Sequence, residues 1–350
     1  MGFFSRNSNT PDNPEAAAQA RAAMAEESLD AALSLQAETA DVVERAPKEE
    51  PAPVEEEGAG MPVVDEDTPF GPVGEDGKLR TYADKLPVTR VVGQTKIIAI
   101  INQKGGVGKS TTAINLSAAL GEMGRQVMLV DLDPQGNTTS GLGIDKRLVS
   151  HSIYDVLMTE YRDNRVYLQD VIIPDVCRGV DVVPATLALA GAELELAMEL
   201  ARESRLKDAL GSFRGKYDYI FIDCPPSLGL LTVNALVAAE KILTPIQCEF
   251  YALEGVTKLL ETMTRVKSAL NPTLDMLGIL MTMYSRTKLS TQVVEEVRNH
   301  FGAKVFDTVI PRAVKISEAP SYGMPITQYD PAGKGAKAYM ALAKEVIQRG

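Results

Sequence analysis

The chain has 350 residues, enough for one large domain or two small ones, and a formal net charge of −11. Its three cysteines are widely spaced without a C-x-x-C pair, and it has only two histidines, which argues against a disulfide scaffold and against cysteine or histidine metal sites. No run approaches the roughly 18 apolar residues of a membrane span, and the first residues lack the apolar segment of a signal peptide, so we expect a cytoplasmic protein without stable membrane insertion.

The negative charge is concentrated at the N-terminus. Residues 1–90 contain 19 acidic and 8 basic residues, whereas the rest of the chain contains 28 of each. The first 90 residues are rich in Ala, Glu and Pro and poor in large apolar side chains, so we expect a largely disordered acidic tail with a transient helix from Asn13 to about Arg45. The tail is either an interaction or autoinhibitory segment or a plain tether. A neutral folded domain, which can carry a basic face, is expected over residues 95–350.

From Lys96 onward, short apolar runs alternate with amphipathic stretches. This alternation predicts an α/β fold with a mainly parallel, doubly wound sheet and helices on both faces. The expected strands cover residues 96–102, 126–131, 180–183, 219–223, 241–246, 276–283 and 304–310. The expected helices cover residues 109–123, 187–211, 228–238, 252–270, 290–300 and 334–348. Such sheets bind ligands at the carboxyl ends of their strands, so the residues just after the strands are expected to carry the chemistry.

The stretch KIIAIINQKGGVGKSTT, from Lys96 to Thr112, predicts a strand, a glycine-rich loop and a helix start. Glycines let several backbone N–H groups point into one concavity, and the helix N-terminus adds unpaired donors and the positive end of its dipole. This pattern is a P-loop and predicts a P-loop NTPase. The predicted nucleotide cradle consists of Gly105, Gly106, Val107, Gly108, Lys109, Ser110 and Thr111. Lys109 would reach the outer phosphates, and the Ser110 hydroxyl would be one ligand of a magnesium ion.

Two carboxylates follow the second predicted strand. Asp131 ends this strand and Asp133 comes two residues later, in the sequence DLDPQGN. Phosphoryl transfer needs positioning and charge neutralisation more than a strong base. One carboxylate would therefore help to hold the water shell of a magnesium ion, and the other would orient the attacking water. The alternative is a polar turn in which Asp133 and Pro134 simply end the strand.

Another predicted strand ends at Asp223, in the sequence KYDYIFIDCPPS. An apolar strand that ends in aspartate is the Walker B pattern, which delivers a carboxylate to the magnesium ion from a neighbouring strand end. Cys224 is expected to be a small buried side chain rather than a nucleophile, because nothing nearby in the sequence marks an activating base.

Basic residues gather late in the chain, at Arg286, Lys288, Arg312 and Lys315. They fall in loops or at helix starts after predicted strands, with few acidic residues among them. Arg312 and Lys315 are three residues apart and would share a face on a helical turn. Lysines and arginines without interleaved aromatic residues suit contacts to the phosphate backbone. Such contacts bind double-stranded DNA without sequence preference. The alternative is an ordinary solvated basic face.

The loop departs from the usual P-loop pattern, which has a glycine five places before Gly108. That place holds Gln103, and Lys104 opens the loop, which reads KGGVGKST. Together with the DLDPQGN, DCPPS and YALEG segments, this loop resembles the ParA/MinD family of ATPases, and the resemblance covers about residues 95–350. In that family the extra lysine reaches across a dimer interface to the partner's nucleotide, which implies the same role for Lys104.

The resemblance also implies ATP and Mg²⁺ as cofactors and assigns roles to residues. The implied catalytic residues are Lys104, Lys109 and Asp133. The implied magnesium ligands are Ser110, Asp131 and Asp223. Asp133 matches the hydrolytic aspartate of the family.

Further roles are implied for the later segments. Arg286 and Lys315 align with the non-specific DNA contacts of the family, and Arg312 completes the predicted DNA-binding set. A lysine at position 315 keeps the charge of an arginine but loses its bidentate fork. Pro311 would line the adenine pocket, and Glu254 would either cap the following helix or contact the dimer partner.

The sequence thus resembles a ParA (Soj-like) ATPase of a chromosome or plasmid partition system. In the implied cycle, ATP closes a homodimer that binds double-stranded DNA of the nucleoid non-specifically, and a ParB-like centromere-binding protein stimulates hydrolysis and releases the dimer. The alternative is a MinD-like membrane-surface positioning regulator, which needs a C-terminal amphipathic helix with basic and large apolar faces. The C-terminal sequence AYMALAKEVIQRG lacks bulky aromatic residues and a basic cluster. Metal-carrier and reductase relatives would need paired cysteines.

Overall fold

The structure is a computed structural model that describes residues 93–159, 164–249 and 254–349. The predicted acidic tail, residues 1–90, lies outside the described residues, as do residues 250–253, which include the first three residues of the YALEG segment. Within the described ranges, no helix combines the length and the apolar character that crossing a membrane requires.

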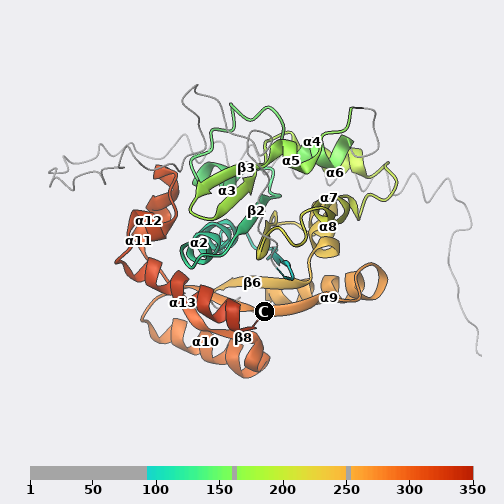
Figure 1. The fold of residues 1–350 in the computed structure, drawn as a ribbon. Coiled ribbons are helices and arrows are strands. Elements are labelled where there is room, and N and C mark those ends of the chain that lie inside the picture. The colour runs from blue at the N-terminus through green and yellow to red at the C-terminus, as the bar shows by residue number, and fades with distance from the viewer. Residues whose placement is uncertain (1–92, 160–163, 250–253, 350) are drawn as a thin grey trace, which may run out of the picture. The chain divides into compact units, whose positions relative to one another are not determined.

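The described residues form one eight-stranded sheet (Figure 1). In chain order its strands are β1 (Lys96–Ile100), β2 (Val127–Asp131), β3 (Ile173–Cys177), β4 (Val180–Val183), β5 (Tyr219–Asp223), β6 (Lys241–Gln247), β7 (Asp275–Tyr284) and β8 (Val305–Pro311). Their order in space is β3-β4-β2-β5-β1-β6-β7-β8. All neighbouring pairs are parallel except β3 with β4, which confirms the predicted mainly parallel, doubly wound sheet.

The central strands are apolar on both faces. In β1, Ile97 and Ala99 belong to one buried cluster, whereas Ile98 and Ile100 belong to the cluster on the other side of the sheet. Strands that are buried on both faces read as continuous apolar runs rather than as alternating ones. These runs explain why the sequence locates every strand except β3 to within two residues at each end.

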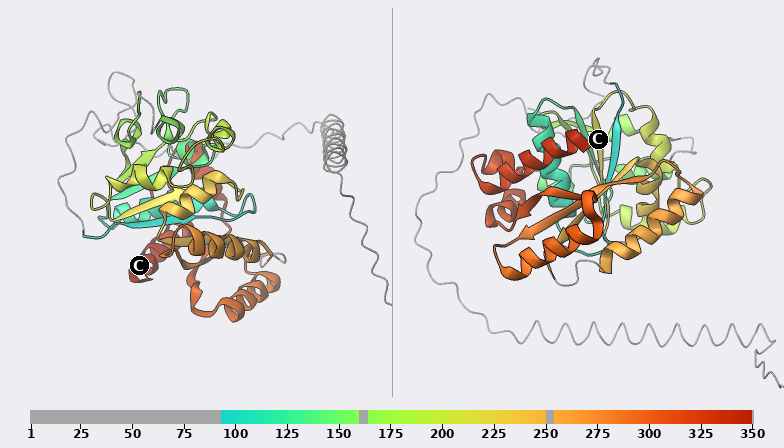
Figure 2. Two further views of the ribbon diagram at one scale, coloured as in Figure 1. Left: turned by 90° about the vertical axis from the view of Figure 1, so that its right-hand side faces the viewer. Right: turned by 90° about the horizontal axis from the view of Figure 1, so that it is seen from below.

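Helices cover both faces of the sheet, as the two views of Figure 2 show. One face packs against α4 (Ile153–Thr159), α5 (Leu168–Val171), α6 (Leu189–Leu196), α7 (Arg205–Gly211), α8 (Leu230–Ala238) and α9 (Glu254–Ala269). The other packs against α2 (Lys109–Glu122), α11 (Val314–Glu318), α12 (Ile326–Tyr329) and α13 (Lys334–Arg349). A third cluster joins α9 and α10 (Lys288–Phe301) to β6, β7 and β8. The short helix α3 (Asn137–Gly141) follows β2 at the carboxyl edge of the sheet.

The helix predicted over residues 187–211 is instead two helices, α6 and α7. Between them the backbone leaves helical geometry, and Ala201 has a φ of +51°. The buried guanidinium group of Arg205 donates hydrogen bonds to the carbonyl oxygens of Leu157, at 3.1 Å, and Leu200, at 3.2 Å. This side chain supplies a donor for the Leu200 carbonyl, which a continuous helix would have satisfied itself. Because the Ala- and Leu-rich sequence continues across the break, its pattern does not reveal it.

The sequence also misses β3 and the short helices. β3 contains Pro174, and Asp175 has a φ of +47° where the pairing with β4 shifts register. Proline and an irregular ladder are features of edge strands that weaken the sequence signal. The helices α3, α4, α5, α11 and α12 have four to seven residues each, which is too short for a helical period to be read.

Candidate functional site

A cavity of about 500 Å³ lies at the carboxyl edge of the sheet. Its walls come mainly from the segments that follow β1, β2 and β5, together with the 3-10 turn η3 (Ala319–Tyr322). The lining residues are Gly105, Gly106, Gly108, Lys109, Ser110, Thr111, Ile114, Asp133, Gln135, Asn137, Ser140, Gly141, Pro226, Met283, Pro320 and Ser321. The structure therefore brings most of the predicted P-loop and Asp133 together around one space.

Two carbonyl groups of the P-loop backbone accept hydrogen bonds from side chains that do not line the cavity. The Gly106 carbonyl accepts a hydrogen bond from the side-chain amide of Gln247 at 3.0 Å, and the Val107 carbonyl accepts one from the Thr282 hydroxyl at 2.9 Å. Gly106 and Gly108 have φ angles of +73° and +89°, which residues with a Cβ rarely adopt. Gly108 is also the N-cap of α2, whose first turn contains no acidic residue. The helix N-terminus is thereby open to an anion.

Lys109 is the buried cation of the cavity. Its side chain is 6% exposed, and its ammonium group donates to the Lys104 carbonyl at 3.3 Å. Burial lowers the pKa of Lys109, while the carboxylates of Asp223 and Asp133 act in the opposite direction. Lys109, which was predicted to reach the outer phosphates, therefore carries its charge near two carboxylates.

Asp131 and Asp223 end two neighbouring strands at the same level, and both are fully buried. Both oxygens of Asp131 accept hydrogen bonds from its own loop. Oδ2 accepts from the Thr139 amide at 2.8 Å and the Thr139 hydroxyl at 2.7 Å, and Oδ1 accepts from the Asp133 amide at 3.2 Å. Asp131 thus organises the segment that carries Asp133, in addition to its predicted place beside a metal ion.

Asp223 differs from Asp131 because one of its oxygens lacks a donor. Oδ2 accepts from the Thr138 hydroxyl at 2.7 Å, but no described residue donates to the buried Oδ1 within ordinary hydrogen-bond geometry. The nearby Ser110 hydroxyl is close enough to lower the pKa of this carboxyl group. A buried carboxylate oxygen without a donor is costly unless a cation meets it. The side chains of Asp223 and Ser110 therefore fit a metal ion.

The two buried carboxyl groups have raised pKa values. Burial, and next the charge of Asp223, raise the pKa of Asp131 to about 7. Burial likewise raises the pKa of Asp223 to about 6, against the hydroxyl groups of Thr138 and Ser110. Among the described residues no group of three His, Cys, Asp or Glu side chains could hold a metal ion by itself. A cation here would need further oxygen ligands, as Mg²⁺ takes from nucleotide phosphates.

Asp133 lines the cavity and is 6% exposed. Its Oδ1 accepts a hydrogen bond from the Gln135 amide at 2.9 Å, which fixes the orientation of the carboxylate. Sequence reasoning missed Thr138 and Thr139, whose hydroxyl groups bind the two buried aspartates. The only signal was the Thr-Thr pair that directly follows DPQGN.

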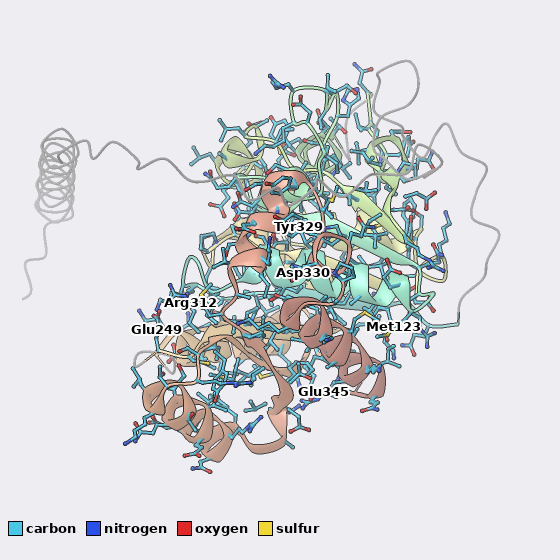
Figure 3. The ribbon with its side chains drawn as sticks, turned by 90° about the vertical axis from the view of Figure 1, so that its left-hand side faces the viewer. Met123, Glu249, Arg312, Tyr329, Asp330 and Glu345 are labelled. Carbon is cyan, nitrogen blue, oxygen red and sulfur yellow. The ribbon has the colours of Figure 1, made fainter. Side chains whose placement is uncertain are left out.

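Lys104 does not line the cavity in this structure. Its ammonium group lies 2.8 Å from Glu249, which is labelled in Figure 3, and both side chains are about half exposed, at 48% and 59%. The Lys104 amide is fixed by the Asn102 side chain at 2.9 Å. The backbone of Lys104 is thus held in place while its side chain points to the surface.

The predicted DNA-binding residues lie at two neighbouring strand ends and on the helix that follows. Arg286 and Arg312 are exposed, and the Arg312 amide donates to the carbonyl of Tyr284, the last residue of β7, at 2.9 Å. The expectation that Arg312 and Lys315 share one helical turn is wrong. Ala313, the N-cap of α11, has an extended φ of −146°, so Arg312 (labelled in Figure 3) precedes the helix.

Lys315 is engaged with its own helix and its neighbour. Its ammonium group lies 3.4 Å from Glu318 and 5.2 Å from the ring centre of Tyr329, which stacks on Tyr322. Hydrogen bonding to Glu318 raises the pKa of Lys315. The structure therefore places aromatic rings beside Lys315, although the sequence shows no interleaved aromatic residues there.

Pro311 was predicted to line an adenine pocket. It is the last residue of β8 and is absent from the lining of the cavity, whereas Pro320 and Ser321 are part of that lining. Val107, which was predicted to be part of the nucleotide cradle, is also absent from this lining because its side chain is buried. The role of Pro311 beside an adenine base therefore stays a prediction.

The chain is similar to known proteins over most of its length. Residues 95–276 match the AAA domain family. The chain is 54% identical over 256 residues to the sporulation initiation inhibitor protein Soj of Bacillus subtilis, covering 73% of this chain and 99% of that protein. It is 52% identical over 255 residues to the chromosome partitioning protein ParA of Myxococcus xanthus, covering 73% and 88%.

Solved structures share the fold. Cobyrinic acid a,c-diamide synthase from Mycobacterium smegmatis, with bound ATP analogue and magnesium, has a TM-score of 0.64 and 39% identity, covering 73% of this chain and 94% of that one. The septum site-determining protein MinD from Pyrococcus horikoshii, complexed with Mg-ADP, has a TM-score of 0.61 and 31% identity, covering 72% and 96%.

The buried carboxyl pair predicts a pH dependence of stability without metal and nucleotide. Because the pKa values of Asp131 and Asp223 are raised from 3.8, the folded state binds more protons than the unfolded state up to about pH 7. The free energy of unfolding should therefore fall, by roughly 1–3 kcal/mol, as pH rises from 5 to 7.5. Asp223→Asn should flatten this slope in urea titrations, and an equal slope in both proteins would contradict the assignment.

Proposed function

The chain belongs to the ParA/MinD family of P-loop ATPases, with Soj and ParA among its relatives, and we propose that it drives a chromosome or plasmid partition system. The partition part of this proposal is carried by the 54% identity to Soj and the 52% identity to ParA. The ATPase part is carried by Asp223 and Ser110 beside the P-loop and the fixed carboxylate of Asp133. This arrangement suits a site that binds a nucleoside triphosphate and hydrolyses it.

ATP with Mg²⁺ occupies the cavity. The open N-terminus of α2 and the Lys109 ammonium group would hold the phosphates, and Pro311 would border the adenine base, as the resemblance to the family implies. Ser110 and Asp223 would hold the magnesium ion, and Asp131, whose oxygens already bind its own loop, would contact the water shell of the ion. When bound, Mg²⁺ offsets the charge of the phosphate oxygens.

Asp133 orients the water that attacks the terminal phosphate. Its carboxylate lines the cavity with one oxygen fixed by the Gln135 amide, which leaves the other available to a water molecule. The segment behind it is anchored by three hydrogen bonds to Asp131. A fixed carboxylate is what this reaction needs, because orientation contributes more than basicity.

ATP closes two copies of the chain into a dimer in which each Lys104 contacts the triphosphate of the other copy, as the resemblance to the family implies. Lys104 must leave Glu249 to do so. The ion pair is about half exposed, and such pairs contribute only about 0–1 kcal/mol, so this contact opposes closure weakly.

The closed dimer binds double-stranded DNA without sequence preference. Arg286 and Arg312, which are exposed at neighbouring strand ends, contribute positive charge to the surface that contacts DNA. Lys315 belongs to it as well, although Glu318 offsets part of its charge in the single copy. A ParB-like protein stimulates hydrolysis and releases the dimer. Because the bound DNA is that of the nucleoid, the protein works in the cytoplasm, on the nucleoid.

The alternative of a MinD-like membrane regulator needs a C-terminal helix with a free apolar face. In this chain the apolar side chains of α13 pack against α2 and β8. These buried residues are Tyr339, Leu342, Ala343 and Val346. The similarity to MinD therefore supports the ATPase core, and α13 itself does not present the free apolar face that a membrane-surface regulator needs.

Replacing Asp133 separates binding from turnover. Asp133→Ala should retain ATP binding and ATP-dependent DNA binding, but it should lower the hydrolysis rate about 100-fold or more because the attacking water is no longer oriented. Asp145→Ala, whose carboxylate pairs with Arg147 outside the cavity, is the matched control. Hydrolysis near the normal rate in Asp133→Ala would show that the assignment is wrong.

The DNA surface can be tested through the salt dependence of binding. Arg286→Ala and Arg312→Ala should each weaken ATP-dependent binding to any duplex and reduce the slope of log affinity against log salt by about 0.9. Arg214→Ala is the control, because Arg214 pairs with Glu240 at the opposite edge of the sheet. Unchanged slopes in both arginine variants would exclude this surface.

We propose that residues 95–350 form the ATPase domain and that residues 1–90 are a separate acidic tail. Deletion of residues 1–90 should leave the melting temperature and the ATP affinity close to those of the full chain, because the P-loop, Asp133 and the other described lining residues of the nucleotide cavity all come after this segment. Calorimetry and nucleotide titration of both proteins check this expectation. A truncated chain that cannot bind ATP would refute the domain boundary.

A further inference from the structure

One wall of the nucleotide cavity comes from a part of the chain far from the P-loop. Pro320 and Ser321 of η3 line the cavity together with the P-loop residues. A single turn of four residues makes few hydrogen bonds of its own, so its position depends on the elements around it. The contacts that hold η3 and the residues after it therefore decide the shape of this wall.

The side chain of Asn115 joins α2, the helix after the P-loop, to the segment after η3. Asn115 is 1% exposed. Its amide nitrogen donates to the Thr111 carbonyl at 2.7 Å, and its amide oxygen accepts a hydrogen bond from the Ile326 amide at 2.6 Å. Thr111 lines the cavity, and Ile326 begins α12, which follows η3. One buried side chain thus connects the backbones of two segments that form the cavity.

The Ile326 amide needs an acceptor from outside its own helix, because the first amides of a helix have no partner within it. The N-cap of α12 is Pro325, whose side chain has no acceptor atom. Ile326 is fully buried, so water does not readily replace a missing acceptor. Asn115 therefore supplies the cap that the local sequence of α12 lacks.

The same wall is packed against α3 through glycines. Gly323 directly follows η3, and an added Cβ there would lie 2.6 Å from the Cα of Gly143, which follows α3. An added Cβ on Gly141 would lie 2.7 Å from the Ile114 side chain and 3.5 Å from that of Pro320. The three elements α2, α3 and η3 thus meet without spare room, and η3 has one well-defined position.

The fixed position of this wall matters for a ligand. A ligand binds more tightly to a cavity whose walls are already in place, because binding then orders fewer groups. Without the Asn115 side chain, the segment from η3 to Ile326 would lose its hydrogen bond to α2, and a bound nucleotide would have to order it. Asn115 is not one of the lining residues, so its influence on a ligand passes through the wall.

We propose that Asn115 is a positioning residue for ATP, which fixes the η3 wall relative to the P-loop and thereby sets the affinity for the nucleotide. This inference rests on the proposed binding of ATP in the cavity. The hydrolysis rate at saturating ATP depends on Asn115 only weakly, because Lys109 and Asp133 are held by other contacts, to the Lys104 carbonyl and the Gln135 amide.

The test compares Asn115→Ala with Asn234→Ala. Asn234 is a matched control because its side chain is buried and makes the same two kinds of contact in α8, away from the cavity. Its amide nitrogen donates to the Leu230 carbonyl at 3.0 Å, and its oxygen accepts from the Leu206 amide at 3.2 Å.

Titration of a fluorescent ATP analogue into each full-length protein with Mg²⁺ measures the affinity. Asn115→Ala should weaken nucleotide binding about fivefold or more, which corresponds to the loss of one buried hydrogen bond, and kcat should stay within about twofold of the parent value. Asn234→Ala should lower the melting temperature by a similar amount but leave the nucleotide affinity unchanged.

A second pair of variants disturbs the wall through a different contact. Gly323→Ala should weaken nucleotide binding as well, because its Cβ would collide with Gly143. Gly302→Ala is the control, since Gly302 also has a positive φ, +54°, but an added Cβ there meets no described atom within 4 Å. Parent-like affinity in either Asn115→Ala or Gly323→Ala would overturn the proposal, as would an equal loss of affinity in either control. A parent chain that does not bind ATP would refute the proposed function itself.

Discussion

The structure depends on two buried carboxyl groups that end adjacent parallel strands. The register of β2 and β5 places Asp131 and Asp223 opposite each other, and burial raises the pKa of both groups. Both oxygens of Asp131 accept hydrogen bonds from the loop that carries Asp133, whereas one oxygen of Asp223, beside Ser110, has no donor among the described residues. One carboxylate therefore builds the loop that faces the cavity, and the other is left for a cation.

The two lysines of the P-loop differ in how firmly they are held, which separates their roles. Lys109 is almost fully buried against two carboxylates, so its charge belongs to the site whether or not a second copy is present. Lys104 has a fixed backbone and an exposed ion pair with Glu249, so its side chain can change partner at little cost. A static cation and a movable one fit the proposed cycle, in which Lys104 changes partner when two copies close.

Local patterns predicted much of the molecule. The apolar runs predicted most of the strands, and the glycine-rich loop predicted the cavity wall from Gly105 to Thr111. Each of these patterns depends on residues that are neighbours in the sequence. The hydroxyl groups of Thr138 and Thr139, and the approach of Pro320 and Ser321 to the cavity, depend on tertiary contacts that no local pattern encodes. The break between α6 and α7 was missed for the same reason, since the distant Leu157 carbonyl and the buried Arg205 help to stabilise it.

The central claim is that the γ-phosphate of ATP switches the protein onto DNA. The most direct measurement is retention of the full-length chain on a non-specific duplex at low salt, with ATP and Mg²⁺, with ADP and Mg²⁺, and without nucleotide. The account predicts retention with ATP and little or none in the other two states. Equal retention in all three states, or none in any, would contradict it.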